Sequence, residues 1–263
     1  MTAHYPQLVG LTGRKRSGKD TVAGFLSQPE NRVSFAEPIK RILMDLNPYL
    51  DGQRSSGSFD DAREQGRLID RLDASLPRWT NVRDILPPRT VLDIPAMLDE
   101  LDPFVRNATP DGRAIKGMGS RLSRFVTRLP DFDRYKDESQ PIDREIRRLQ
   151  QVLGTEIGRT MIARDLWVST GMRNVHRIMP QAEDHDRVVI TDCRFDDEAQ
   201  AIRQAGGVVL RVTRPSLPPP DDSHASEAGV SDDLVDLEVI NDGSLEDLEA
   251  AVRIVLPRTQ SSP

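Results

Sequence analysis

The chain has 263 residues, of which 37% are hydrophobic and 30% charged, and its formal net charge is -6. This length suffices for one α/β domain with a large insertion or for two small domains, and a single core domain is the simpler interpretation. The acidic balance gives no global electrostatic case for binding nucleic acid or a membrane surface, so any anion site must be locally basic. One cysteine excludes an intramolecular disulfide, and no apolar run approaches the ~20 residues of a membrane span, so we expect a cytoplasmic protein.

Short β-branched runs alternate with helical patterns near both ends of the chain, as in a parallel sheet covered by helices on both faces. Residues 143 to 165 predict a long amphipathic helix that contains Gly154 and Gly158, and Ser244 is placed to cap a final helix. Five runs predict strands, and most are too continuously apolar to have one wet face: residues 8 to 13, 32 to 36, 187 to 193, 207 to 214 and 236 to 242.

The middle of the chain is rich in turn signals such as LPPRT and NATPDGRAIKGMGS, which predict an insertion rather than more sheet. Another proline- and acid-rich stretch joins the last two predicted strands and is long enough to form a flap. We therefore expect a core of residues 1–47 and 141–258, an insertion of residues 48–140, a flap at about 214–233 and a disordered tail of residues 259–263.

The segment GRKRSGKDT fits the G-x-x-x-x-G-K motif and stands between a predicted strand and a predicted helix. Glycines at its two ends allow successive N–H groups to converge on one point, and the following helix adds the positive end of its dipole. The lysine is placed to bridge the outer phosphates of ATP. We call residues 13–19 the phosphate loop and expect all of them to bind the triphosphate: Gly13, Arg14, Lys15, Arg16, Ser17, Gly18 and Lys19.

Asp20 stands where this motif normally has Ser or Thr. A carboxylate can join the shell of Mg²⁺ directly or through water, because this ion prefers hard oxygen ligands. Thr21 still offers a hydroxyl to an inner phosphate or to the metal. The alternative for Asp20 is an acidic residue that the helix dipole favours in the first turn.

The stretch TGRKRSGKDTVA resembles the phosphate loop of bacteriophage deoxynucleoside monophosphate kinases, a group of the P-loop nucleoside-monophosphate kinase superfamily in which Lys-Asp-Thr is usual. Animal-type phosphomevalonate kinases have a similar loop, so this stretch does not separate the two. The resemblance implies a P-loop kinase fold with a five-stranded parallel sheet flanked by helices. It further implies a mostly helical insertion that forms the acceptor-binding region, a short flap, and use of ATP and Mg²⁺.

The block RRLQQVLGTEIGRTMIARDLWV, residues 147 to 168, resembles the series that lines the monophosphate pocket of these kinases. Arg159 is our first candidate for clamping the acceptor phosphate, because a planar guanidinium can hold two oxygens. The alternative is a solvated arginine face on an amphipathic helix. Lys40, in SFAEPIK, is a further candidate for the acceptor phosphate. Arg148 is our second candidate for clamping this phosphate. The resemblance implies these substrate-binding residues in the block: Gln150, Thr155, Glu156, Arg159, Asp165 and Trp167.

The run VVITDCRFDDEAQAI ends a predicted buried strand with Asp192 and Arg194. A carboxylate at this place can hold Mg²⁺ or its waters, and the arginine would face the phosphates. The alternatives for Asp192 are helix capping and a structural ion pair. We expect Cys193 to be a buried filler rather than a nucleophile, and the three acids that follow to belong to the first turn of a helix: Asp196, Asp197 and Glu198.

Two residues near the end of the chain complete the predicted nucleotide site. Arg214 is placed to stack on adenine or to reach the phosphates. Asn241 ends the last strand, where the superfamily places groups against adenine, although a turn with a helix cap explains it nearly as well.

These predictions combine into a deoxynucleoside monophosphate kinase that makes dNDP from dNMP and ATP. The catalytic residues would be Lys19, Arg159, Arg194 and Asp192, with Asp20, Thr21 and Asp192 as metal ligands. The alternatives are a phosphomevalonate kinase-like enzyme and an ATP-binding protein without transferase activity, and LGTEIGR favours the nucleotide acceptor. We expect a protein of the host cytoplasm that forms a homodimer or acts alone, with no nucleic acid or membrane as partner.

Overall fold

The computed structural model describes residues 7–50, 62–105, 141–182, 186–217 and 229–257. Packing divides the chain into two compact units, one made of Met1–Phe35 with Thr170–Pro263 and the other of Ala36–Ser169. Each unit has a hydrophobic core of its own. The predicted tail and the middle of the predicted flap lie outside the described residues.

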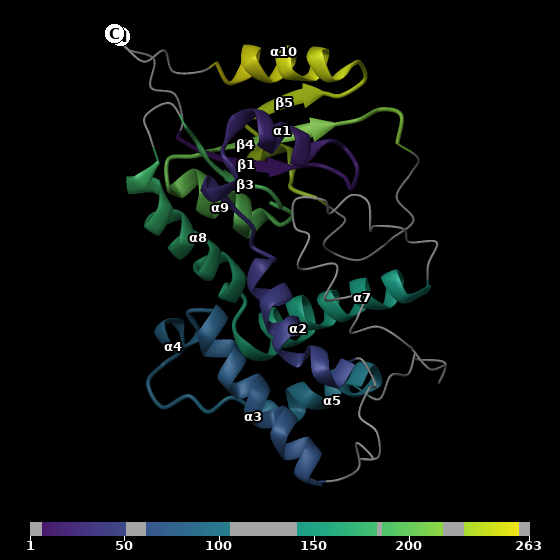
Figure 1. Cartoon of the computed structure of the whole chain (residues 1–263). Helices are drawn as coiled ribbons and strands as arrows, with labels where there is room; N and C mark the ends of the chain where they lie inside the picture. Colours follow the sequence, from purple (N-terminus) through teal and green to yellow (C-terminus); the bar gives the residue numbers. More distant parts are fainter. Residues whose placement is uncertain (1–6, 51–61, 106–140, 183–185, 218–228, 258–263) are drawn as a thin grey trace. The chain divides into compact units, whose positions relative to one another are not determined.

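A five-stranded, all-parallel sheet forms the centre of the first unit (Figure 1). The strand order is β2-β3-β1-β4-β5, so the first strand of the chain lies in the middle. Val9 pairs with Val189 on one side and with Val208 on the other. Each strand falls within a predicted run, which confirms the expected α/β fold: β1 (Leu8–Thr12), β2 (Arg32–Val33), β3 (Val188–Ile190), β4 (Val208–Thr213) and β5 (Leu237–Ile240).

Helices cover both faces of this sheet. On one face, α1 (Lys19–Leu26) and α10 (Leu245–Val255) pack on side chains such as Val9 and Leu11. Because successive strand residues point to opposite faces, Gly10 faces the other side. There α9 (Asp196–Gln204) places Ile202 so close to Gly10 that an added Cβ would overlap with it. The described part of this unit also contains three short 3-10 helices: η1 (Pro29–Asn31), η4 (Met179–Gln181) and η6 (Asp232–Leu234).

The final helix begins as predicted. The backbone N–H of Asp247 donates to Ser244 Oγ at 3.2 Å, and the Ser244 N–H donates to Asp247 Oδ2 at 2.9 Å. These two hydrogen bonds lower the pKa of the Asp247 carboxyl. The reciprocal pair satisfies two backbone donors that a helix start would otherwise leave open.

The described part of the second unit is mostly helical. Its core includes Ile42, Leu72, Phe104 and Leu149. The described part of the expected insertion is mostly helical, as predicted, and residues 80–81 and 86–93 connect its helices. The helices are α2 (Glu37–Leu50), α3 (Ala62–Trp79), α4 (Val82–Ile85), α5 (Ile94–Val105), α7 (Pro141–Gln151), a π-helix (Val152–Ile162) and α8 (Leu166–Ile178), which crosses the boundary between the units.

The packing units differ from the division expected from the sequence. That division placed boundaries at residues 47 and 141, whereas the packing places them after Phe35 and Ser169. The cause is that α2, α7 and the π-helix share one apolar core with α3 and α5. The assignment of a catalytic core and an acceptor-binding subdomain is a functional division and stays a prediction.

Among the described residues, no helix combines the length and the hydropathy that crossing a bilayer requires.

Candidate active site

The phosphate loop joins β1 to α1 through an unusual backbone. Three of its residues have positive φ: Gly13 at 132°, Arg16 at 64° and Gly18 at 106°. A Cβ on Gly13 would overlap with the carbonyl oxygen of Val212, so both glycines meet a requirement that other residues would not. Strained backbone such as that of Arg16 persists where the surroundings impose it, and it is concentrated at ligand-binding sites.

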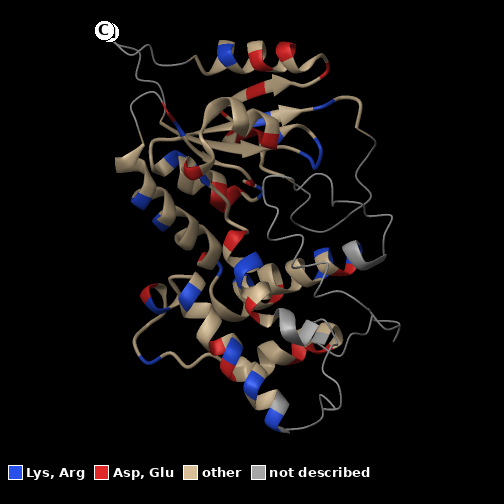
Figure 2. Cartoon of the chain, in the orientation of Figure 1, with Lys and Arg blue, Asp and Glu red and all other residues tan. Residues whose placement is uncertain are grey.

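Lys19 curls back over this loop. Its Nζ donates to the carbonyl oxygens of Gly13 and Arg14, at 2.7 Å each. The turn between β1 and α1 is a basic region in Figure 2, since Arg14, Lys15 and Arg16 lie there. The ammonium group and this positive charge lie at the amino end of α1, where backbone N–H groups and the helix dipole favour an anion.

Two further observations concern the interior of the loop. Ser17 is 1% exposed, and its Oγ has no hydrogen-bond partner within the described parts of the chain. The side chain of Asn241 donates from Nδ2 to the Ser17 carbonyl oxygen at 2.8 Å. Asn241, which we predicted to lie against adenine, thus contacts the phosphate loop itself.

The candidate metal ligands lie in two places. Asp20 and Thr21 are exposed in the first turn of α1, so a carboxylate and a hydroxyl stand beside the loop. Asp192 follows β3, and its two oxygens accept from Ser34 Oγ at 2.7 Å and from the Phe35 N–H at 2.8 Å. A carboxylate oxygen can accept more than one interaction, so these two bonds orient the group and do not by themselves exclude a cation. This set of hard oxygens fits Mg²⁺, which is commonly held by one or two carboxylates and substrate phosphates.

Glu198 holds the turn that carries Arg194. This glutamate is 4% exposed and accepts from the backbone N–H of Arg194 at 2.7 Å and of Phe195 at 3.1 Å. Its place in the first turn of α9 was predicted, but its contact with this turn was not. Burial, followed by the charge of Glu198, raises the pKa of the Cys193 thiol well above its usual value. Cys193 is therefore the inert filler we expected.

Several predicted acceptor residues of the second unit lie on α7 and on the π-helix that follows it. Three of them have a side-chain atom that is buried and lacks a hydrogen-bond partner among the described residues: Arg148 Nη2, Gln150 Nε2 and Glu156 Oε2. Arg148 also donates from Nε to Glu145 at 3.3 Å and lies 4.4 Å from the ring centre of Phe104. Buried polar groups are almost always paired in folded proteins, so each of these three atoms is a candidate for contact with a polar ligand.

The two glycines of the predicted long helix, Gly154 and Gly158, lie in the π-helix and contact Trp167. A Cβ on Gly158 would lie 2.5 Å from Cε2 and Nε1 of Trp167, and the indole N–H donates to the Gly154 carbonyl oxygen at 2.6 Å. Trp167 is only 3% exposed, so the structure gives it a packing role instead of direct contact with a substrate. π-helices are rare and are frequent at functional sites.

The remaining candidates have exposed or half-buried side chains. Arg159 donates from Nη1 to the Arg164 carbonyl oxygen at 3.4 Å, and Arg214 donates from Nε to Ser216 Oγ at 3.3 Å. The other three lie on α2, in the π-helix and just before α8: Lys40, Thr155 and Asp165.

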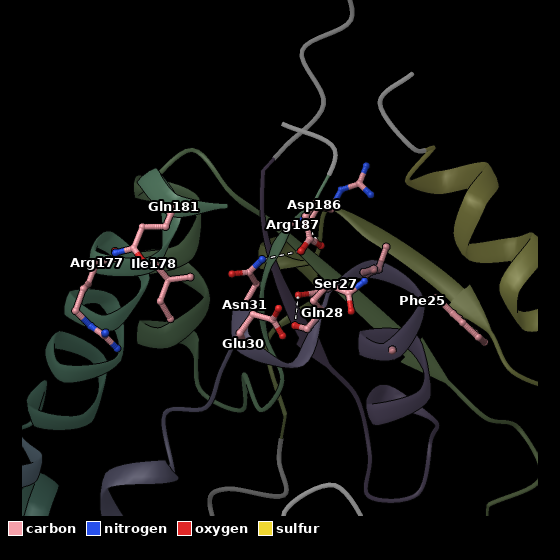
Figure 3. A pocket seen from close by; sticks show the side chains of 12 residues that line it. Phe25, Ser27, Gln28, Glu30, Asn31, Arg177, Ile178, Gln181, Asp186 and Arg187 are labelled. Carbon is pink, nitrogen blue, oxygen red and sulfur yellow. Dashed lines mark hydrogen bonds between the residues drawn. The ribbon is translucent and has the colours of Figure 1, made fainter. Parts of the chain in front are cut away.

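The structure thus brings one predicted set together within the first unit. The phosphate loop, Asp192, Arg214 and Asn241 follow β1, β3, β4 and β5, and the carboxyl ends of parallel strands meet at one edge of a sheet. A cavity of about 670 Å³ lies at the opposite edge, where Asn31 precedes β2 and Asp186 precedes β3. Figure 3 shows the side chains that line it. This cavity shares no residue with the phosphate loop.

A glycine-rich phosphate loop after the central strand of a parallel five-stranded sheet defines the class: an α/β protein with a P-loop kinase fold. Residues 7–252 match the family described as deoxynucleotide monophosphate kinase, and the chain belongs to that family. It is 29% identical to the deoxynucleotide monophosphate kinase of Enterobacteria phage T4 over 262 residues, which cover 95% of this chain and 98% of the relative.

Two other phage proteins are also similar over nearly the whole chain. The deoxynucleotide monophosphate kinase of Escherichia phage RB69 is 29% identical over 266 residues, which cover 95% of this chain and 99% of the relative. The deoxynucleoside-5'-monophosphate kinase of Escherichia phage T5 is 25% identical over 253 residues, which cover 89% of each chain. The resemblance seen in the sequence is confirmed, and the chain is a kinase.

Proposed function

We propose that this protein transfers the γ-phosphate of ATP to a deoxynucleoside monophosphate, giving dNDP and ADP. The observation that carries the proposal is the phosphate loop, in which Lys19 and the strained backbone form an anion site, in a chain of this family. The relatives' names supply the class of acceptor.

On the donor side, the loop amides and Lys19 hold the triphosphate. In the structure Lys19 Nζ donates to the carbonyl oxygens of Gly13 and Arg14. When the triphosphate binds, the lysine turns from these oxygens and donates to the phosphates. Asp20 and Thr21 would hold Mg²⁺, and Asp192, at the end of a neighbouring strand, would support the ion or its waters. The ion would supply positive charge against the charge of the triphosphate.

On the acceptor side, Arg159 clamps the monophosphate, with Lys40 as a second cation. The buried polar atoms of Arg148, Gln150 and Glu156 recognise the nucleoside. A site with buried donors and acceptors discriminates strongly, because an analogue that lacks the matching groups leaves them unpaired. Thr155 and Asp165 complete the polar lining, and Trp167 acts indirectly by fixing the Gly154 carbonyl oxygen.

The transfer step needs little covalent chemistry from the protein. The acceptor is already an anion, so the reaction requires in-line positioning and fixed positive charge instead of a general base. Arg159, Arg194 and Arg214 would meet the charge that spreads over the transferred group. Arginines in such roles contribute about 10³ to 10⁵ in rate, equivalent to roughly 4 to 7 kcal/mol.

An assay with a panel of acceptors tests the proposal. Purified protein is incubated with ATP and Mg²⁺ and with each dNMP, each NMP or phosphomevalonate, and ADP is measured. We expect ADP formation that depends on at least one dNMP. Turnover with phosphomevalonate alone would overturn the proposal, and nucleotide binding without acceptor-dependent turnover would instead favour a non-catalytic ATP-binding protein. We place the enzyme in the host cytoplasm and expect neither nucleic acid nor membrane as a partner. Size-exclusion chromatography with light scattering tests for a homodimer.

A further inference from the structure

Asn241 connects the last strand of the sheet to the phosphate loop. Its backbone N–H donates to the Thr213 carbonyl oxygen at 2.7 Å, which continues the pairing of β5 with β4. Its side-chain Nδ2 donates to the Ser17 carbonyl oxygen at 2.8 Å. The acceptor is a carbonyl, so the donor must be the NH₂ end of the amide. The backbone of Asn241 is therefore fixed by the sheet while its side chain holds the loop.

The contact is close as well as directional. A Cβ built on Gly18 would lie 2.5 Å from the same Nδ2 atom. This residue therefore has to be glycine for a second reason besides its φ of 106°. The amide of Asn241 lies against the Ser17–Gly18 peptide with no room for a larger group between them.

Holding this carbonyl determines where the next N–H points. In a trans peptide the C=O and the N–H are coplanar and point in opposite directions. The Ser17–Gly18 bond is trans, since the described chain has no cis peptide. Because the Ser17 carbonyl points to Asn241, the Gly18 N–H points away from Asn241 and β5. That amide belongs to the group of loop donors that precedes α1, where an anion is favoured.

We propose that Asn241 is a positioning residue that fixes the Ser17–Gly18 peptide so that the Gly18 N–H is directed at the triphosphate. This inference rests on the proposed function for its biological meaning, but its physical content concerns triphosphate binding alone. It assigns Asn241 to the polyphosphate through the loop, in place of the adenine contact expected from the sequence. The two assignments differ in a measurable way, because tripolyphosphate has phosphates and no base.

Two substitutions at Asn241 distinguish the effect of losing the Nδ2 hydrogen-bond donor from the effect of losing the side-chain volume. Asn241→Asp is nearly isosteric but places an oxygen that cannot donate beside the Ser17 carbonyl. Asn241→Ala removes the amide and adds no charge. Gln200→Glu matches the change in charge at an exposed position of α9 and serves as the control. Calorimetry gives the dissociation constants of ATP and tripolyphosphate for each variant, and thermal melts establish that each is folded.

We expect Asn241→Ala to weaken both ligands by the same factor, about tenfold, as for a hydrogen bond whose partly buried partner is left unsatisfied. Asn241→Asp should weaken the binding of both ligands further. The dissociation constants of Gln200→Glu should stay within about twofold of wild type, and so should the KM of the Asn241 variants for the acceptor. Weaker ATP binding with unchanged tripolyphosphate binding would overturn the inference in favour of an adenine contact. Unchanged binding of both ligands, or a wild-type protein that does not bind tripolyphosphate, would overturn it too.

The same measurements distinguish this failure from failure of the proposed function. If wild-type protein binds tripolyphosphate and the Asn241 variants do not, but no dNMP gives ADP, the proposed function is wrong and the role of Asn241 stands. If Asn241→Asp does not fold, Asn241→Ala carries the test, since it leaves no charge beside the loop. Normal turnover with dNMP and normal affinity for tripolyphosphate in Asn241→Ala would remove the inference and leave the kinase proposal intact.

Discussion

Replacing Gly158 by alanine tests whether the π-helix is built around Trp167. In an ordinary helix interior this change stabilises by about 1 kcal/mol, because glycine loses more backbone entropy on folding. Here the new Cβ would lie 2.5 Å from two atoms of an indole that is 3% exposed. Overpacking of this kind costs about 1 to 3 kcal/mol. If the indole moves, the Gly154 carbonyl also loses its donor, at a cost of about 1 to 3 kcal/mol.

With the gain of about 1 kcal/mol set against these two costs, we expect Gly158→Ala to lower the free energy of unfolding of the second unit by about 1 to 5 kcal/mol. Both tryptophans of the chain, Trp79 and Trp167, belong to that unit, so the loss of intrinsic fluorescence in urea reports on it directly. Gly66→Ala is the matched control. It lies within α3, a Cβ there meets no described atom within 4 Å, and a gain of about 0.5 to 1 kcal/mol is expected. Equal or greater stability of Gly158→Ala than of Gly66→Ala would refute the reasoning.

Three further variants test other contacts of the structure. Lys19→Ala should reduce kcat by several orders of magnitude while the melting temperature stays near wild type, and near-normal rates would mean that the lysine does not reach the phosphates. Arg159→Ala should raise the KM for dNMP much more than the KM for ATP, and a defect confined to ATP would assign this arginine elsewhere. Ser231 donates from its backbone N–H and its hydroxyl to Asp196, which lowers the pKa of that carboxyl below its usual value. These hydrogen bonds favour the ionised carboxylate, so their contribution to stability is present at neutral pH and is lost as the pH falls through the folded-state pKa. Ser231→Ala should therefore raise the Asp196 pKa in an NMR titration and reduce the stability that the protein loses on acidification. An unchanged titration would show that the Ser231 hydroxyl does not act on this carboxyl.

The features that depend on neighbouring residues could be predicted from the sequence. Strands buried on both faces read as continuous apolar runs, and the five runs gave the five strands of the sheet. The phosphate loop is equally local, since its glycines and Lys19 lie within seven positions of each other. The cap at Ser244 needs only a partner three residues away.

The features that depend on tertiary packing could not be predicted from the sequence. No periodicity shows that α2 packs with α3 and α5, which is why the unit boundary follows Phe35 instead of residue 47. The sequence is compatible with Trp167 as a pocket residue and as a core residue, and its contact with Gly158 shows that it belongs to the core. The role of Glu198 is intermediate: an acid in the first turn of a helix was expected, but the turn that it holds carries Arg194.

The bond between Asn241 and Ser17 joins positions 224 residues apart, and it has a consequence during synthesis. The ribosome adds the phosphate loop long before it adds Asn241, the residue whose side chain steadies that loop. β4, whose Val212 carbonyl lies against Gly13, also comes late. A growing chain released before these strands would carry the whole motif in its sequence and still bind polyphosphate poorly, so ATP would stabilise finished molecules and not fragments.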